Sequence, residues 1–451
     1  MARAVVLFNR DLRVRDNPAL SAAARAKKVV PLFVLDDALL ESRFASPNRV
    51  AFLLEALRDL DGSLRKAGGR LCIRRGNPVE MALAVAGESG AEELHVSADW
   101  SAYARRREGR LRRACERERI AFRTHPGTTI VAPGTVRPAS GDHFKVFTPF
   151  HRAWAEVPLR PRVAEPRQLE IPSRLGLGRL PALDSLLPGR TSPGRAKGGE
   201  SEGRRLMRSF LRHGLPRYDR HRDDLAANAT SSLSPYLRFG CISPTELLER
   251  TRFQSNSEAF ARQLCWRDFH HQVLAAFPAL PRRDYRPRGD RWSRSRRAFE
   301  AWREGRTGYP IVDAAMRQLA TEGWMHNRAR MIVASFLTKD LYLDWRWGAE
   351  HFWDLLSDGE IANNAGNWQW VAGTGNDTRP NRVLNPLRQA KRFDPDGEYV
   401  RRHLPEMEAV EGAAIHEPWR LPPAQRRSLA YPEPIVDHGE AAAAFQARRA
   451  S

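Results

Sequence analysis

The chain has 451 residues, which is enough for two or three domains with separate cores. Hydrophobic residues make up 42% and charged residues 28%, a balance that excludes a disordered chain, and no apolar run reaches the roughly 18 residues that a membrane span needs. The net charge of +21 favours a polyanionic partner such as nucleic acid, because each phosphate that a cation neutralises releases counterions.

Short apolar runs alternate with helical stretches in residues 1–130. Four of the runs are predicted as strands buried on both faces: residues 4–8, 29–35, 71–73 and 93–96. Between the second and third runs, residues 49–57 place apolar side chains at helical spacing. This alternation predicts a parallel, Rossmann-like α/β domain. The chain contains neither G-x-G-x-x-G nor a Walker sequence in this part, so nucleotide chemistry of the usual kind is not indicated.

Residues 131–205 are predicted to link this domain to a second one. Proline, glycine, arginine and serine are frequent from about residue 158. From residue 206 to residue 451 the pattern is helical almost throughout, which predicts an all-α domain. Nine of the 12 tryptophans lie between Trp266 and Trp370, a concentration that is unusual for a purely structural domain.

The cysteines give no sign of metal or disulfide chemistry. Cys72, Cys115, Cys241 and Cys265 have neither the spacing of metal ligands nor the density of a disulfide scaffold. The first residues carry one charge and a short apolar run, which fits a buried strand better than a signal peptide. We therefore expect reduced thiols in a cytoplasmic protein that does not enter a membrane.

Two polar segments interrupt the apolar pattern of the helical part. Residues 358–370 combine two carboxylates, four amides and two indoles with glycines, and either half alone could be a surface loop followed by core tryptophans. In residues 323–331, helical spacing places Asn327 and Met331 on one face. Arg330 enters an apolar helix there and calls for a carboxylate partner, because an unpaired buried charge is costly.

Two further segments could bind ligands. Helical spacing aligns four side chains along one stripe: Gln263, Trp266, Arg267 and His270. The hydroxyl-rich turn at residues 230–236, with Tyr218 upstream, precedes a predicted helix. Its hydroxyls and free N–H groups could cradle a phosphate, although a plain helix cap explains the same residues equally well.

Taken together, five segments resemble the signature of the photolyase and cryptochrome family: residues 9–18, 145–150, 308–317, 324–330 and 364–370. They occur in order over essentially the whole chain. Within the family, the sequence is most similar to class I photolyases, which repair cyclobutane pyrimidine dimers in DNA. The resemblance implies an N-terminal antenna domain and a C-terminal helical domain that holds FAD in a U-shaped conformation.

The resemblance also implies roles for particular residues in binding FAD. On the ribityl-phosphate side these are Tyr218, Thr230, Ser231, Ser232, Leu233 and Ser234. Around the rest of the cofactor they are Arg267, Asn327, Arg330, Asp358 and Glu360. Arg330 is expected to pair with Asp358 beside the isoalloxazine, and Asn364 to face flavin N5. The protein would thereby tune a cofactor that carries the difficult chemistry.

Three tryptophans match the family's electron relay from the surface to the flavin, namely Trp292, Trp345 and Trp368. Core packing would explain any one of them alone. Three at matching positions favour the relay. We expect Trp292→Phe to block photoreduction while sparing repair by enzyme that was reduced beforehand.

The substrate face implied by the resemblance contains Gln263, Trp266, Arg267, Asn327, Met331 and Trp370. Flat indoles suit a dimer flipped out of the duplex. The amide of Asn327 and the thioether of Met331 stand where photolyases for the (6-4) photoproduct tend to have histidines, which favours cyclobutane dimers. Gln263 departs from the glutamate of many such enzymes, although an amide can still bond a pyrimidine edge.

The resemblance leaves an antenna chromophore and two rival functions open. Arginines replace the Asn-Glu pair associated with a folate antenna near residues 100–107, which favours a deazaflavin or none. The rivals are a (6-4) photolyase and a cryptochrome-type photoreceptor without repair activity, and Asn364, the substrate indoles and the short tail after residue 434 oppose the second. We expect a monomer that binds dimer-containing DNA without a metal.

Overall fold

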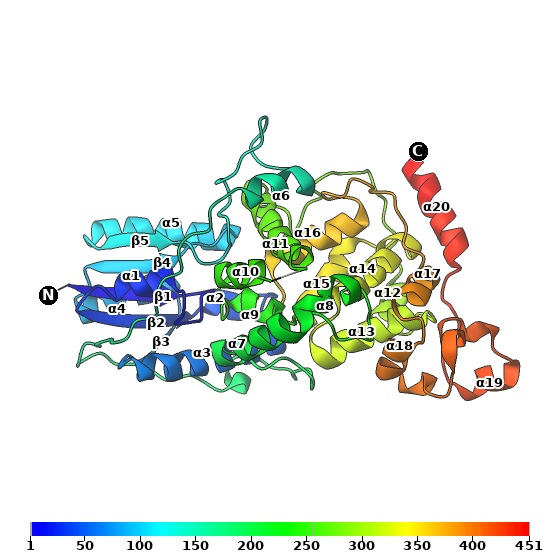
Figure 1. Ribbon diagram of the computed structural model, residues 1–451, viewed down its shortest axis with the longest axis horizontal. Coiled ribbons are helices and arrows are strands. Elements are labelled where there is room, and N and C mark those ends of the chain that lie inside the picture. Colours follow the sequence, from blue (N-terminus) through cyan, green and yellow to red (C-terminus); the bar gives the residue numbers. More distant parts are fainter. Residues whose placement is uncertain (1, 255, 451) are drawn as a thin grey trace.

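The computed structural model describes residues 2–254 and 256–450 and begins with a parallel sheet (Figure 1). The strand order is β3-β2-β1-β4-β5. The bounds are β1 Arg3–Phe8, β2 Lys28–Leu35, β3 Cys72–Arg75, β4 Glu93–Ser97 and β5 Ala121–His125. Four strands match the predicted runs. The fifth was not predicted, because β5 is an edge strand with largely exposed side chains and therefore lacks a buried apolar run.

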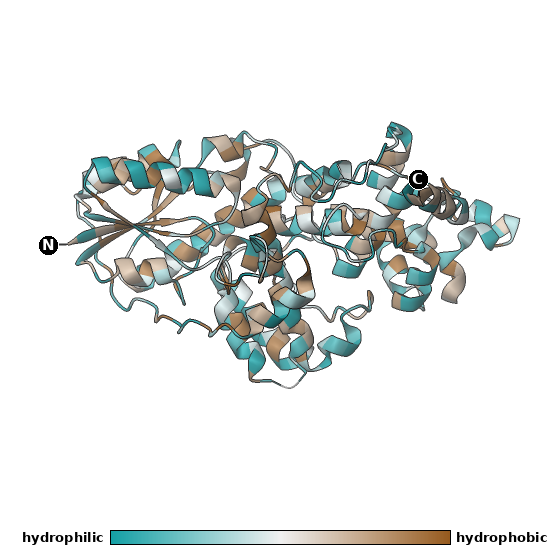
Figure 2. Cartoon of the chain, turned by 90° about the horizontal axis from the view of Figure 1, so that it is seen from above, coloured by the Kyte–Doolittle hydropathy of each residue, from teal (hydrophilic) through white to brown (hydrophobic). Residues whose placement is uncertain are grey.

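Helices cover both faces of this sheet. They are α1 Pro18–Ala23, α2 Asp37–Leu40, α3 Pro47–Lys66, α4 Pro78–Ser89 and α5 Ala102–Arg117. Alternate residues of β1 belong to different cores: Val6 packs with α1 and α3, whereas Val5 packs with α4 and α5. Figure 2 shows the apolar strands between helices with hydrophilic outer surfaces. The prediction of a parallel, Rossmann-like α/β region is confirmed.

The segment after β5 runs back along the sheet and over the helical part. It contains α6 Phe147–Ala155 and η1 Leu183–Ser185. Its backbone is tied to the α/β region, since Leu169 N–H donates to the carbonyl of Ala67 at 2.6 Å. Trp154 on α6 donates to Asp268 on α11 at 3.0 Å. The segment therefore fastens the two parts together along its length.

The rest of the described chain is helical. The first elements are α7 Glu200–Ser209, η2 Phe210–Gly214, α8 Leu215–His221, α9 Ser234–Phe239, α10 Pro244–Arg252, α11 Glu258–Ala276, α12 Arg296–Arg303, α13 Pro310–Glu322, α14 Asn327–Ser335 and η3 Phe336–Asp340. The later ones are α15 Trp345–Leu355, α16 Ile361–Ala372, α17 Pro386–Phe393, α18 Glu398–His403, η4 Pro405–Met407, η5 Gly412–His416, η6 Pro418–Arg420, α19 Pro423–Ser428 and α20 His438–Ala450. The all-α prediction is confirmed.

Helices α11 and α16 pack closely in the middle of the helical part (Figure 1). A Cβ on Gly366 of α16 would lie 2.2 Å from Nδ1 of His270 on α11, so only glycine permits this approach.

The four cysteines are buried and free. Among the described residues, no helix has the length and apolar character required to cross a membrane.

Candidate functional site

Glu360 is the centre of a buried charged cluster where the two parts of the protein meet. It occupies the N-cap position of α16 and forms an ion pair with Arg10, which follows β1. Two groups on α11 also face its carboxylate: Arg267 Nη2 at 3.3 Å and His271 Nε2 at 3.1 Å. The cluster joins the carboxyl end of a central strand to the two central helices. The amide of Asn363 donates to the other carboxylate oxygen of Glu360, so this buried carboxylate is both ion-paired and hydrogen-bonded.

Burial and neighbouring charges set the pKa values in this cluster. Burial lowers the pKa of the Arg267 guanidinium to about 10. Burial, together with Arg267 and Arg10, lowers the pKa of His271 well below its usual value. Burial alone would raise the pKa of Asp99, but Arg10, the N–H of Ser101 and the neighbouring cations together outweigh it and hold that pKa far below its usual range. Asp99 and Glu360 thus flank Arg10 as two anions.

Arg330 and Asp358 form the ion pair that the sequence predicted. Two contacts of 2.8 and 3.2 Å make the pair bidentate, and Nε of Arg330 donates to the carbonyl of Met325 at 2.8 Å. The pair connects α14 with the turn before α16. Asn364 lies one turn beyond Glu360 on α16, so the two side chains share a face. Its amide donates to the carbonyl of Ala349 at 3.1 Å.

The predicted hydroxyl turn has an unused buried donor. Within the described residues, Thr230 Oγ1 is buried without a hydrogen-bond partner. Ser231 accepts from the N–H of Leu233 at 3.3 Å, and Ser232 adopts a left-handed φ of 51°. The indole N–H of Trp324 donates to the hydroxyl of Ser234 at 3.3 Å. This hydrogen bond brings the turn beside the segment that leads into α14. The turn thus lies close to the helix that carries Arg330.

Tyr218 and Leu233 line the same region from the apolar side. Tyr218 on α8 is buried against Phe210 and Phe260, with both ring pairs edge to face. Leu233 is fully buried before α9. An unpartnered hydroxyl, a bidentate arginine pair and an anion held by guanidinium groups suit a large cofactor with phosphate and heterocyclic parts. The residues present therefore fit FAD.

The three predicted relay tryptophans run from the core to half-buried positions. Trp368 on α16 and Trp345 at the start of α15 are buried, and Trp292 is half-buried. The Trp368 indole lies against Gly348 of α15, where a Cβ would be 2.1 Å from its ring. Gly348 is one turn beyond Trp345. A backbone bridge between Ser293 and Leu343 then brings Trp292 towards the start of α15.

Trp368 has another aromatic neighbour that the sequence did not single out. The Trp302 ring packs edge to face against it, with 6.1 Å between centroids. Trp302 is fully buried, and its indole N–H donates to the carbonyl of Val333 at 3.0 Å. Phe352 also contacts Trp368, at 5.0 Å. The aromatic environment of Trp368 is thus branched.

The predicted substrate residues follow α11 and α14 from solvent towards the core. Gln263 is exposed and Trp266 is half-buried. One face of Trp266 is covered by Phe147 of α6, whose ring is parallel at 3.7 Å. Asn327 is exposed, and its amide lies 3.9 Å from the sulfur of Met331 on the same face of α14. The predicted sharing of a face is confirmed.

Trp370 is half-buried near a cation. The Arg382 guanidinium lies 5.0 Å from its ring centroid. The residue between the two indoles, Gln369, is fully buried and anchors a loop, since its amide donates to the carbonyls of Leu280 and Arg283. Trp370 is thereby held at the surface end of α16 beside an arginine.

Sequence reasoning did not assign three residues that complete the charged cluster. Arg10 was noted only as part of a motif, and His271 follows His270 by one step around α11. Arg238 on α9 donates to the carbonyl of Gly359 at 2.7 Å. The position of Arg10 directly after a predicted strand, within a motif, was the available signal for the first. The other two depend on how helices dock.

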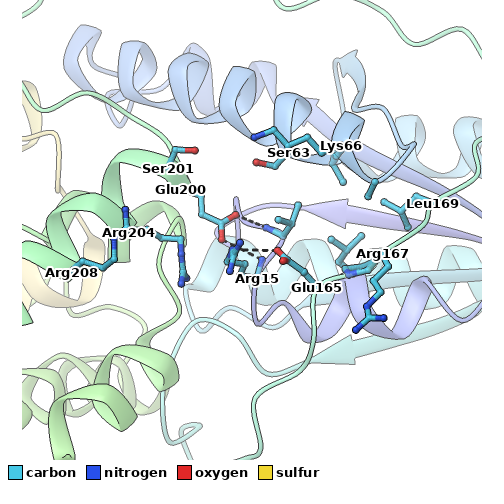
Figure 3. Close-up of a pocket in the computed structure, with 15 residues that line it drawn as sticks. Arg15, Ser63, Lys66, Glu165, Arg167, Leu169, Glu200, Ser201, Arg204 and Arg208 are labelled. Atoms are coloured by element: carbon cyan, nitrogen blue, oxygen red, sulfur yellow. Dashed lines mark hydrogen bonds and ion pairs between the residues drawn. The ribbon is translucent and has the colours of Figure 1, made fainter.

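A basic pocket of about 540 Å³ lies elsewhere and contains none of the predicted site residues (Figure 3). Its wall includes Arg15, Lys66 and Arg167, with Glu200 at the start of α7. Burial raises the pKa of Glu200 to about 7, although the N–H groups of Val14 and Arg15 donate to its carboxylate. The described residues include no group of three or more His, Cys, Asp or Glu that could hold a metal ion.

Comparison with known proteins agrees with this geometry. The family model of the FAD binding domain of DNA photolyase matches residues 260–451. The family model named DNA photolyase matches residues 4–168. A deoxyribodipyrimidine photo-lyase from Streptomyces griseus is 53% identical over 454 residues, covering 100% of this chain and 99% of the relative. One from Escherichia coli is 35% identical, covering 100% and 99%.

Solved structures extend the likeness to the fold. A class III photolyase from Agrobacterium tumefaciens superposes with a TM-score of 0.93 at 34% identity, covering 100% of this chain and 97% of that one. An archaeal photolyase from Sulfolobus tokodaii, solved with two FAD molecules, has a TM-score of 0.86 at 32% identity, covering 99% of both chains. The chain belongs to the DNA photolyase family. It is an enzyme with a FAD-binding helical domain.

Proposed function

We propose that this enzyme repairs cyclobutane pyrimidine dimers in DNA in a light-driven reaction. Bound FAD, reduced and excited by light, would supply the electron. The observation that carries the choice of substrate is the pairing of Asn327 with Met331 on the exposed side of α14. An amide and a thioether offer no general acid. Opening a cyclobutane ring requires an electron and its return, whereas oxygen transfer in a (6-4) photoproduct requires proton transfer.

The charged residues are proposed to hold and tune the cofactor. Arg330 and Asp358 would flank the isoalloxazine, and Asn364 would face N5, where an amide can serve as donor or acceptor. Glu360 would orient Arg267 towards the cofactor through their ion pair, while Arg10 and the His271 imidazole also face its carboxylate. Fixed charges of this kind stabilise a bound group without rearranging.

The hydroxyl turn is proposed to hold the phosphate side. Thr230 Oγ1 has a free donor, and the turn carries the hydroxyls of Ser231, Ser232 and Ser234. Leu233 and Tyr218 would pack against the apolar part of the chain between the two ring systems. The relay Trp368, Trp345 and Trp292 would carry an electron inward from the surface when the cofactor needs to be reduced.

The substrate would enter between indoles at the surface end of α11 and α16. Trp266 has one face covered by Phe147, so stacking of a base would use the other face. Gln263 would hydrogen-bond a pyrimidine edge, with Arg267 behind it. Arg382 beside Trp370 suits a DNA phosphate, and a chain with a net charge of +21 should bind DNA less tightly as salt rises.

One relative supports a rival function. A protein named cryptochrome DASH from Natronomonas pharaonis is 36% identical over 472 residues. A photoreceptor without repair would need the same FAD cradle and relay but not the substrate indoles. For the antenna chromophore, we propose a deazaflavin rather than folate, because arginines occupy residues 105–107 of α5.

Repair of defined lesions tests the proposal. Purified protein with reduced FAD is mixed with duplexes containing one thymine cyclobutane dimer or one (6-4) photoproduct, in blue light and in darkness. We expect loss of the cyclobutane dimer only, and only in light.

Trp370→Ala should weaken binding of the dimer by roughly 1–3 kcal/mol, the value of one base stack, whereas Trp419→Ala should leave it unchanged. Loss of the (6-4) lesion alone, or no repair with FAD bound, would contradict the proposal.

A further inference from the structure

Tyr342 lies against the outermost predicted relay tryptophan. Its ring centroid is 5.0 Å from that of Trp292, with 44° between the planes. Trp292 is half-buried, whereas Tyr342 is 8% exposed. Among natural side chains, a phenol is the other group besides indole that readily gives up one electron. The Trp292 ring therefore contacts a second oxidisable ring besides the other tryptophans of the proposed relay.

The backbone fixes this contact. Tyr342 adopts a left-handed φ of 49°, which is strained for a residue with a large side chain. The N–H of Ser293 donates to the carbonyl of Tyr342 at 2.8 Å, and Ser293 pairs with Leu343 in an isolated parallel bridge. The two rings are thus carried on segments that are hydrogen-bonded to each other.

The phenol also has a proton acceptor within transfer distance. Tyr342 Oη donates to Asp290 Oδ1 at 3.1 Å, and Asp290 Oδ2 forms an ion pair of 2.9 Å with Arg449. Proton transfer requires an acceptor at about 2.6–3.2 Å. Burial raises the pKa of Tyr342, and the neighbouring Asp290 carboxylate raises it further, so the resting phenol stays protonated. Burial raises the pKa of Asp290 above its usual value, although the Arg449 cation opposes this shift.

We propose that Tyr342 is the terminal electron donor of the relay and that Asp290 takes its proton. The inference rests on the proposed relay. In the step, one electron moves from the Tyr342 ring to the Trp292 radical cation, which still holds its indole proton and returns to its neutral closed-shell state. The phenolic proton moves to Asp290 Oδ1, so the products are a neutral tyrosyl radical and a protonated carboxyl. Charge and electrons balance without another reactant.

The C-terminal helix explains why the proton must leave with the electron. The Arg448 guanidinium of α20 lies 4.4 Å from the Tyr342 ring centroid. A cation there disfavours a positively charged phenol radical but tolerates a neutral one. Phe445 of the same helix packs edge to face on Tyr342 at 6.3 Å and covers it from solvent. Proton transfer to Asp290 then slows the return of the electron to Tyr342. The cofactor therefore stays reduced after the light pulse has ended.

Flash photolysis of the FAD-loaded enzyme tests this inference. Oxidised enzyme is excited directly at the flavin, and tryptophan and tyrosyl radicals are followed by transient absorption and electron spin resonance. In the wild type, a neutral tyrosyl radical should appear as the tryptophan radical decays, more slowly in D₂O. Tyr342→Phe should abolish the tyrosyl signal and prolong the tryptophan radical on the order of tenfold. Asp290→Asn, which keeps an oxygen acceptor that cannot take a proton, should prolong it similarly.

A matched control separates this pair from a general tyrosine effect. Tyr103 on α5 also donates to a carboxylate, Asp36, but belongs to the α/β region. Tyr103→Phe should leave the radical kinetics unchanged. Wild-type decay in Tyr342→Phe, or no isotope effect in the wild type, would overturn the role of Tyr342 and leave the relay standing. Absence of any tryptophan radical in the wild type would overturn the relay itself, and the inference with it.

Discussion

The charged cluster around Glu360 and the tryptophans Trp292, Trp345 and Trp368 are stabilised in opposite ways. The cluster keeps charge in the interior by direct pairing: Arg10, Arg267 and His271 all face one carboxylate. The tryptophans are uncharged and pack in an apolar cluster, and the indole N–H of Trp345 donates to Asp284 at 2.9 Å. Both depend on α16, which carries Glu360 at its start and Trp368 two turns later.

The difference predicts how each region fails. Removing one charge from a paired cluster leaves the others buried and uncompensated, so folding and cofactor binding should suffer. Replacing an indole with a smaller ring leaves the packing mostly intact, so electron transfer should suffer first. The two regions can therefore be separated by measuring stability and photoreduction on the same variants.

The largest effect is expected at Glu360. Glu360→Gln keeps the shape but removes the negative charge that faces Arg10 and Arg267, and it should lower the free energy of unfolding by about 3–5 kcal/mol and reduce bound FAD. Glu350→Gln is the control, because its ion pair with Arg43 is exposed and should contribute about 0–1 kcal/mol. Denaturant unfolding measures both. Equal losses would mean that pairing at Glu360 contributes no more than a surface pair.

Variants of Glu200 test the effect of burial on a carboxyl whose hydrogen bonds do not come from charged groups. It is buried like Glu360, but its hydrogen bonds come from backbone N–H groups, and burial raises its pKa from 4.5 to about 7. The folded state holds the proton of Glu200 more tightly than the unfolded state does. The contribution of Glu200 to the free energy of unfolding is therefore fully present below pH 4.5 and is lost as pH rises through 7. The stability of the wild type relative to Glu200→Gln should fall by about 3 kcal/mol over that window.

Unfolding at a series of pH values measures this difference. Glu202→Gln on the same helix is the control, since the ion pair with Arg205 lowers the pKa of Glu202 and the dependence should have the opposite sign. A flat difference between the wild type and Glu200→Gln would show that Glu200 titrates normally.

The smallest change in free energy is expected among the tryptophans. Trp345→Phe should slow photoreduction at least about tenfold, equivalent to about 1.4 kcal/mol in the barrier, while the bound FAD stays constant. Trp302→Phe is matched in burial and contacts Trp368, yet should have little effect. Photoreduction under steady blue light measures both. The reverse result would place the electron path through Trp302.

Several features of this protein could be predicted from local sequence pattern. Apolar runs between helices predicted the parallel sheet, because a strand buried on both faces has few residue types available to it. Helical spacing placed Asn327 beside Met331 and called for a partner to Arg330, which proved to be Asp358. The family motifs then located the residues of the candidate cofactor site.

Tertiary structure alone decided the contacts between segments that lie far apart in the chain. Nothing in the periodicity around Arg10 or Glu360 indicates that they meet, since the end of β1 reaches α16 only after the sheet docks on the helices. The same holds for Phe147 on Trp266 and for Tyr342 against Trp292. Periodicity reports which face of an element is buried, whereas the partner on that face depends on how the elements pack.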